Sequence, residues 1–265
     1  MGTKTLDNRQ GHWLLAKMGK KVLRPGGKEL TLKLINGLDI SSTDAVVEFA
    51  PGLGFTADIV LKKTPKTYTG IELNEAATAI LRKKINGKGR SIIVGNAGAS
   101  TLEASSYNKV YGEAMLTMQP DHKKSKIIKE AYRILKPGGL YGIHEIGLTP
   151  NDISSEDKKT IQRKLAAVIN VNARPLTVKE WSDLLEKEGF VIRQVIKNPM
   201  HLLELKRVID DEGLFRTLKI MGNMILHPSA TKRIMAMRKV FRDAAHQLNS
   251  VAIIAEKTAS KTPVS

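Results

Sequence analysis

The 265-residue sequence contains no cysteine. Without a thiol, the chain can form no disulfide, no thiolate metal site and no iron–sulfur cluster, and it has no cysteine nucleophile. It also lacks any apolar run near the roughly 20 residues that span a bilayer, and its N-terminus lacks the apolar stretch of a signal peptide. These absences favour a cytoplasmic protein.

Acidic residues are also few. The chain has 26 Asp and Glu against 43 Lys and Arg, a formal net charge of +17. Such a field favours anionic partners, but the basic residues are spread along the chain, with no basic tail or appended nucleic-acid module. The expected partner is a small-molecule substrate with an anionic or a partly apolar portion. Nucleic acid is the less favoured partner, and the sequence does not define the oligomeric state.

The pattern of residues 44–145 predicts a parallel β-sheet with crossover helices. Proline and glycine at 137–139 are expected to end the last helix and turn the chain into the next strand. Apolar β-type runs, interpreted as strands, occupy residues 45–49, 67–72, 91–94, 109–113 and 140–145. Helical stretches between them lie near residues 56–63, 75–85 and 122–135.

The rest of the chain is mostly helical. Further strands are expected at 190–196 and 251–256, which brings the sheet to seven strands, and helices at 11–18, 29–38, 154–170, 177–188 and within 200–248. The domain organisation follows from this pattern. It comprises an N-terminal helical extension or lid at 1–43, one domain at 44–257 with helical insertions at about 149–176 and 200–249, and a disordered tail at 258–265.

A glycine turn follows the first predicted strand, which ends in Glu48 and Phe49. The turn passes through Gly52 and Gly54 and leads into a helix. Glycine lets the backbone approach a ligand closely, and the helix N-terminus offers free N–H groups. The next strand ends about 20 residues later at Glu72, whose carboxylate can accept both hydroxyl protons of a ribose. Loop and acid together predict a nucleoside-binding site, a pattern that NAD sites share.

These residues resemble the class I S-adenosylmethionine-dependent methyltransferases, whose motif is an acidic residue followed by x-Gly-x-Gly-x-Gly. Residues 48–54 read Glu-Phe-Ala-Pro-Gly-Leu-Gly, so Ala50 replaces the first glycine. We expect this change to be tolerated if φ at Ala50 is negative. The Leu-Lys-Pro-Gly-Gly stretch at 135–139 is also typical of the family. An NAD dehydrogenase would instead show a third glycine where Ala57 stands.

The resemblance implies a doubly wound, mostly parallel seven-stranded α/β sheet of the Rossmann-like type, with the last strand antiparallel. It implies S-adenosylmethionine as the cofactor. Asn96-Ala97 falls on the family's adenine-side position, where an asparagine oxygen can accept from the adenine amino group. The residues assigned to the cofactor are Glu48, Ala50, Pro51, Gly52, Gly54, Glu72, Leu73, Asn96, Ala97 and Glu113.

Catalysis is expected at the carboxyl ends of the fourth and fifth strands, where open α/β sheets bind ligands. Methyl transfer needs in-line placement, and a base if the acceptor carries a proton. Glu113 and His144 are the candidate catalytic residues, although His144 could be structural and Glu113 could cap backbone donors. No metal site is expected, because the carboxylates in this region are scattered. The candidate substrate contacts are His12, Trp13, Met115 and Glu145.

The sequence does not identify the methyl acceptor. The favoured function is methyl transfer to a small or medium-sized molecule under a largely helical cap, whose methionine-rich segment at 200–249 could hold an apolar portion. The alternatives are an RNA or protein methyltransferase that uses the diffuse positive charge, and a non-catalytic S-adenosylmethionine-binding protein. The absence of cysteine excludes 5-methylcytosine chemistry.

Glu72→Ala tests the cofactor assignment. The ribose would lose one or two hydrogen bonds to a charged group, so S-adenosylmethionine should bind roughly 2–3 kcal/mol more weakly. Titration calorimetry measures this change, and an unchanged affinity would refute the assignment.

Overall fold

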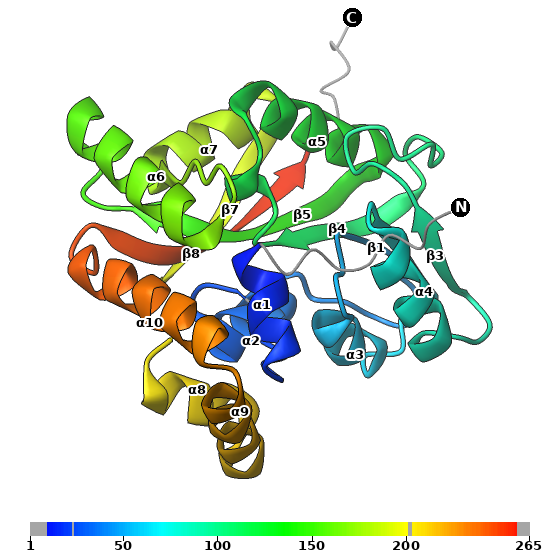
Figure 1. The fold of residues 1–265 in the computed structure, drawn as a ribbon. Helices are drawn as coiled ribbons and strands as arrows, with labels where there is room; N and C mark the ends of the chain where they lie inside the picture. Colours follow the sequence, from blue (N-terminus) through cyan, green and yellow to red (C-terminus); the bar gives the residue numbers. More distant parts are fainter. Residues whose placement is uncertain (1–9, 23, 201–202, 259–265) are drawn as a thin grey trace, which may run out of the picture.

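The computed structural model describes residues 10–22, 24–200 and 203–258, which form an α/β fold around one twisted sheet (Figure 1). The sheet order is β3-β2-β1-β4-β5-β8-β7, with the short β6 beside β5. The strands pair in parallel except β8, which is antiparallel to both of its neighbours. This confirms the predicted architecture. The strands are β1 (Ala45–Phe49), β2 (Thr67–Glu72), β3 (Arg90–Val94), β4 (Tyr107–Glu113), β5 (Leu135–Leu148), β6 (Leu176–Thr177), β7 (Phe190–Pro199) and β8 (Leu248–Lys257).

Helices cover both faces of the sheet. Helices α5 (Asp121–Ile134) and α7 (Val178–Lys187) lie on one face, and α2 (Gly27–Gly37), α3 (Phe55–Leu61) and α4 (Glu75–Lys84) lie on the other (Figure 1). Because side chains alternate along a strand, each face has its own apolar core. The two cores are contiguous clusters of buried residues, one built on α5 and α7 and the other on α2, α3 and α4.

A third apolar core forms a helical cap over the carboxyl ends of β4 and β5. It joins α1 (Gly11–Lys17), α6 (Ser155–Ile169) and α10 (Pro228–Asp243) to the ends of β5 and β8. Helices α8 (Leu205–Glu212) and α9 (Leu214–Leu226) extend from this cap, away from the sheet (Figure 1). The predicted N-terminal extension therefore consists of two parts: α1 belongs to the cap, and α2 belongs to the helix layer on one face of the sheet. Residues 1–9 of the expected lid and 259–265 of the expected tail lie outside the described residues.

Local signals set most of the element boundaries. Ser154 caps α6 by accepting from the Asp157 N–H, and Thr177 and Glu180 form a capping box at the start of α7. One predicted boundary is wrong. Helix α5 ends at Ile134 and β5 begins at once, so the Pro-Gly-Gly stretch lies inside the strand, where Gly138 has a φ of +79°. The register between β4 and β5 shifts there, and the loop is absorbed as an irregularity of the strand.

Glu48 of β1 is buried within the sheet rather than exposed at its end. Its carboxylate accepts hydroxyl hydrogen bonds from Tyr68 and, at 2.7 Å, from Tyr111. Burial raises the pKa of Glu48 to about 7, because the two tyrosine hydrogen bonds offset only part of the lost hydration. Glu48 therefore organises the sheet beneath the glycine loop.

Glu48→Gln should flatten the pH dependence of stability. A raised carboxyl pKa means that the folded state holds the proton more tightly, so stability falls as pH rises from the unfolded pKa to about 7. From pH 5 to pH 8 the wild type should lose roughly 3 kcal/mol of unfolding free energy relative to the variant. Urea titrations at the two pH values measure the difference. The exposed Glu103→Gln is the control, and parallel pH profiles for wild type and Glu48→Gln would contradict the prediction.

Candidate functional site

The loop after β1 presents bare backbone to open space. Gly52 has a φ of +59°, and a Cβ built on it would meet nothing within 4 Å. Gly54, at a φ of +74°, serves packing instead, since its Cβ would lie 2.8 Å from Leu81 Cδ2 of α4. Gly52 therefore leaves room for a ligand, and Gly54 lets the loop and α4 approach each other.

Ala50 departs from the conformation expected of it. Its φ is +53°, in the left-handed region, so the condition under which alanine was expected to be tolerated is not met. This conformation costs an L-residue roughly 1 kcal/mol. The Ala50 N–H donates to the Ile71 carbonyl at 2.8 Å, which holds the residue in place. The loop thus keeps the shape that glycine normally supplies, at some strain.

Glu72 joins the end of β2 to the glycine loop. One carboxylate oxygen accepts from the Gly52 N–H at 2.9 Å, and the other accepts from the Asn74 N–H at 2.9 Å. Burial raises the pKa of Glu72 against the opposing effect of these backbone hydrogen bonds. Each oxygen keeps a further lone pair, so the carboxylate can still receive two ribose hydroxyls.

The end of β3 completes this edge of the sheet. Val94 pairs with Glu72, and the exposed Asn96 follows two residues later. The Asn96 side-chain oxygen accepts from the Gly98 N–H at 2.8 Å and keeps one lone pair, while Ala97 packs into the core. Leu73 leaves 72% of its side chain exposed beside Glu72, where an aromatic base could cover it. The open glycine, the ribose acceptor and this apolar surface fit an adenosyl group.

Glu113 at the end of β4 lies in a buried polar network. Its carboxylate accepts from Thr31 Oγ1 at 2.7 Å, from His144 Nδ1 at 2.8 Å, and from Arg24 and Thr56. Burial alone would raise the pKa of Glu113, but the Arg24 charge and the His144 hydrogen bond outweigh it and lower that pKa to about 2. Glu113 is therefore an ionised anchor for three surrounding segments.

His144 of β5 is fully buried in the same network. Its Nε2 faces the Pro25 carbonyl and its Nδ1 faces the ionised Glu113. Both ring nitrogens lie within hydrogen-bond distance of protein oxygens, and the buried ring does not line the cavity where a substrate could meet it. The predicted catalytic role of His144 is corrected on this ground: it holds the turn before α2 against β4 and β5.

Glu145 also points away from any substrate. Its buried carboxylate accepts from the backbone N–H groups of Met115, Leu116 and Thr117 and from Thr117 Oγ1. Burial raises the pKa of Glu145 despite these four hydrogen bonds. The predicted substrate role is replaced by a structural one, shaping the loop after β4. Met115 and Trp13 are likewise buried in the protein interior, and of the four predicted contacts only His12 lines the cavity.

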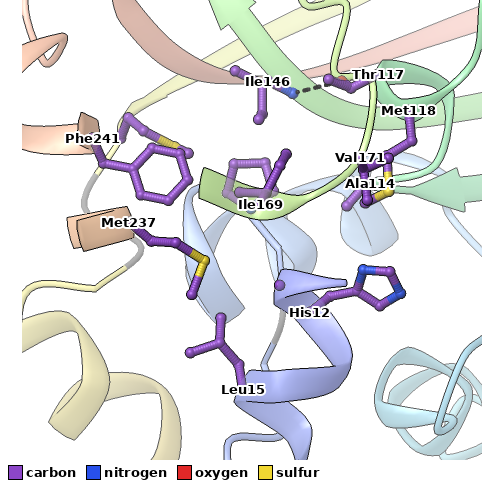
Figure 2. A pocket seen from close by; sticks show the side chains of 13 residues that line it. His12, Leu15, Ala114, Thr117, Met118, Ile146, Ile169, Val171, Met237 and Phe241 are labelled. Atoms are coloured by element: carbon purple, nitrogen blue, oxygen red, sulfur yellow. Dashed lines mark hydrogen bonds between the residues drawn. The ribbon is translucent and has the colours of Figure 1, made fainter. Parts of the chain in front are cut away.

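The cavity lies where the cap meets the carboxyl ends of β4 and β5 (Figure 2). It encloses about 60 Å³ between α1, α10 and the loops after β4 and α6. Most of its lining side chains are apolar. They are contributed by Gly11, His12, Leu15, Pro25, Ala114, Thr117, Met118, Ile146, Ile169, Val171, Met200, Met237 and Phe241.

His12 is the titratable residue in this lining. Burial lowers the pKa of His12 to about 4, so its imidazole is neutral at neutral pH. Sequence reasoning located the segments that form the cavity but missed Leu15 and Phe241. The spacing of Met237 and Phe241, one helical turn apart on α10, was the available signal.

Among the described residues, no three His, Asp or Glu side chains are grouped so that they could hold a metal ion. Within the same part of the chain, no helix combines the length and apolarity needed to cross a membrane.

Relatives identify the family. A model described as a methyltransferase domain matches residues 46–139. The uncharacterized methyltransferase YdaC of Bacillus subtilis is 32% identical over 136 residues, which cover 50% of this chain and 72% of that protein. An uncharacterized protein of Haemophilus influenzae is 37% identical over 251 residues, or 93% of this chain and 98% of that protein.

Solved structures share the fold. The cyclase SpnF has a TM-score of 0.73 at 15% identity, covering 96% of this chain and 95% of its own. Phosphoethanolamine N-methyltransferase 2 of Haemonchus contortus, in complex with phosphomonomethylethanolamine and S-adenosylhomocysteine, has a TM-score of 0.69 at 16% identity, covering 94% and 57%. The chain belongs to the class I S-adenosylmethionine-dependent methyltransferases.

Glu113→Gln tests the buried network. It would leave Arg24 and the His144 ring without their anion, so the unfolding free energy at pH 7 should fall by about 3–5 kcal/mol. The difference in unfolding free energy between wild type and variant should persist above pH 5 and shrink below pH 4. The Glu113 carboxyl has a pKa of about 2 in the folded state, so it takes up its proton at a lower pH than in the unfolded state. Chemical denaturation measures both, with Glu103→Gln as control. Lost activity with unchanged stability would indicate a purely catalytic Glu113.

Proposed function

We propose that this methyltransferase transfers a methyl group to a small or medium-sized acceptor whose apolar portion lies in the cavity under the cap. The main support for this proposal is the position of the apolar cavity at the carboxyl ends of β4 and β5. Phe49 of β1 pairs with Gly112 of β4, so the loops that follow these strands are neighbours. The glycine loop does not line the cavity, but it would lie next to the loop after β4, which does.

The cofactor would lie along the carboxyl ends of β1, β2 and β3. The backbone at 50–54, which includes Pro51, would pass close to it at Gly52; Glu72 would accept its ribose hydroxyls, and Leu73 with Asn96-Ala97 would flank its base. When bound, S-adenosylmethionine supplies a methyl group on a sulfonium, which becomes a thioether on transfer. Glu48 and Glu113 support this edge from below through their buried partners.

His12 would orient the acceptor. Neither of its ring nitrogens has a hydrogen-bond partner in the described residues, and its neutral ring keeps a lone pair at pH 7. In the cavity it can accept a hydrogen bond from an acceptor O–H or N–H. As the new bond to the methyl carbon forms, the acceptor's proton passes to the imidazole nitrogen. Thr117 is the other polar side chain in the lining, and its hydroxyl donates to Glu145.

His12→Asn should lower the single-turnover methyl-transfer rate by about 100-fold or more, with S-adenosylmethionine affinity within twofold of wild type. The assay incubates the protein with methyl-labelled S-adenosylmethionine and a cell extract, and follows label in the small-molecule fraction. Val171→Trp, which fills the cavity, should also abolish transfer, and the exposed His122→Asn is the matched control.

The same assay separates the alternatives. Label that appears in RNA, or in protein, would contradict a small-molecule acceptor. A steep salt dependence of RNA binding would support the RNA outcome. Binding of S-adenosylmethionine without formation of S-adenosylhomocysteine in any extract would indicate a non-catalytic protein.

A further inference from the structure

The outward face of α9 is apolar. Phe215 is 90% exposed, Ile225 79% and Leu226 75%, and Leu214, Leu218 and Met221 are each about half exposed or more. At 100° per residue, Leu214, Leu218, Met221 and Ile225 form one stripe, with Phe215 and Leu226 on its flank. We call these six residues the α9 stripe. A contiguous exposed stripe of this kind marks an interaction surface.

The opposite side of α9 is already packed. Thr217 and Ile220 are buried, and the Asn223 side chain donates to the Met18 carbonyl at 3.0 Å at the end of α1. This contact fixes the helix on the cap with the stripe facing outward. Helix α9 lies at the periphery of the molecule, beyond α1 and α10 (Figure 1). The apolar side chains of the stripe are therefore exposed while the opposite side of the same helix is packed against the protein.

The charges on α9 and α10 near the stripe are basic, and four of these cations pair with acids just outside the two helices or at their ends: Arg216 with Glu212, Arg238 and Arg242 with Glu204, and Lys239 with Asp243. Residues 213–242 contain seven Lys and Arg (216, 219, 232, 233, 238, 239 and 242) and no Asp or Glu. Lys219 lies on α9 beside the stripe, and Lys232 follows on α10; both are exposed. An apolar helix face bordered by cations is the pattern of helices that lie in the headgroup region of anionic bilayers.

We propose that the α9 stripe docks onto an anionic lipid surface. Apolar side chains would enter the headgroup–acyl boundary while Lys219 and Lys232 meet lipid phosphates. With 13 residues, α9 is about 20 Å long and too short to span the roughly 30 Å of hydrocarbon, so it lies on the surface. A second copy of the chain fits less well, because a two-fold contact through the stripe would bring the same cations together.

Helix α1 connects the α9 stripe to the cavity. This helix contributes His12 and Leu15 to the lining and contacts α9 at its other end. A lipid surface could therefore deliver an apolar acceptor to the cap. The docking itself does not rest on the proposed function, and its test needs no methyl acceptor.

Vesicle flotation of the full chain tests the proposal. The wild type should bind vesicles of phosphatidylcholine with 30% phosphatidylglycerol at least tenfold more tightly than vesicles of phosphatidylcholine alone. The double variant Phe215→Ser/Ile225→Ser should lose at least tenfold of this binding. Its matched control is Ile80→Ser/Val191→Ser, exposed apolar residues of α4 and β7, which should bind as wild type.

A charge variant separates lipid docking from general stickiness. Lys219→Glu/Lys232→Glu should lower binding to the anionic vesicles at least tenfold, whereas Lys62→Glu/Lys66→Glu at the α3–β2 turn should change it less than threefold. Equal binding to neutral and anionic vesicles, or full binding by Phe215→Ser/Ile225→Ser, would overturn the proposal. So would sedimentation showing a dimer that this double variant converts to monomer without vesicle binding by the wild type.

Discussion

The hydrogen bond between the Gly52 N–H and the Glu72 carboxylate holds together the edge of the sheet where the cofactor is proposed to bind. It ties the loop after β1 to the end of β2, and the parallel register of these strands brings the two within reach. With the loop held in this way, Gly52 faces open space and Glu72 keeps lone pairs for a ligand. The carboxylate that holds the loop is therefore also the group proposed to accept the ribose hydroxyls.

Other carboxylates near this edge are turned inward. Glu48 is bound by two tyrosines, Glu113 by an arginine, two threonines and a histidine, and Glu145 by three backbone N–H groups and a hydroxyl. Each is buried, and Glu113 and Glu145 use both carboxylate oxygens, whereas both tyrosines bind the same oxygen of Glu48; each acid therefore stiffens a strand end or a loop. The site is thus a rigid edge built by buried acids, and the proposed chemistry falls to groups in the cap, chiefly His12.

The sequence predicted the main strands and the sheet class, because apolar runs, glycine turns and helix caps are local signals, but not the two-residue β6. It did not predict which way Glu145 and His144 would point. Their partners, among them Pro25 and Thr117, are distant in sequence, and only the folded chain brings them together. The positive φ of Ala50 was missed for a similar reason, since a contact with β2 enforces it against the residue's own preference.

The proposed methyl transfer requires that an adenosyl group fits the open edge at Gly52, with the cofactor's sulfur toward the cavity. A crystal structure of the protein with S-adenosylhomocysteine measures this directly. The ribose hydroxyls should lie within hydrogen-bond distance of the Glu72 carboxylate, and the thioether sulfur should face the space that His12 lines. A ligand bound elsewhere, or a crevice closed by the protein's own side chains, would contradict it.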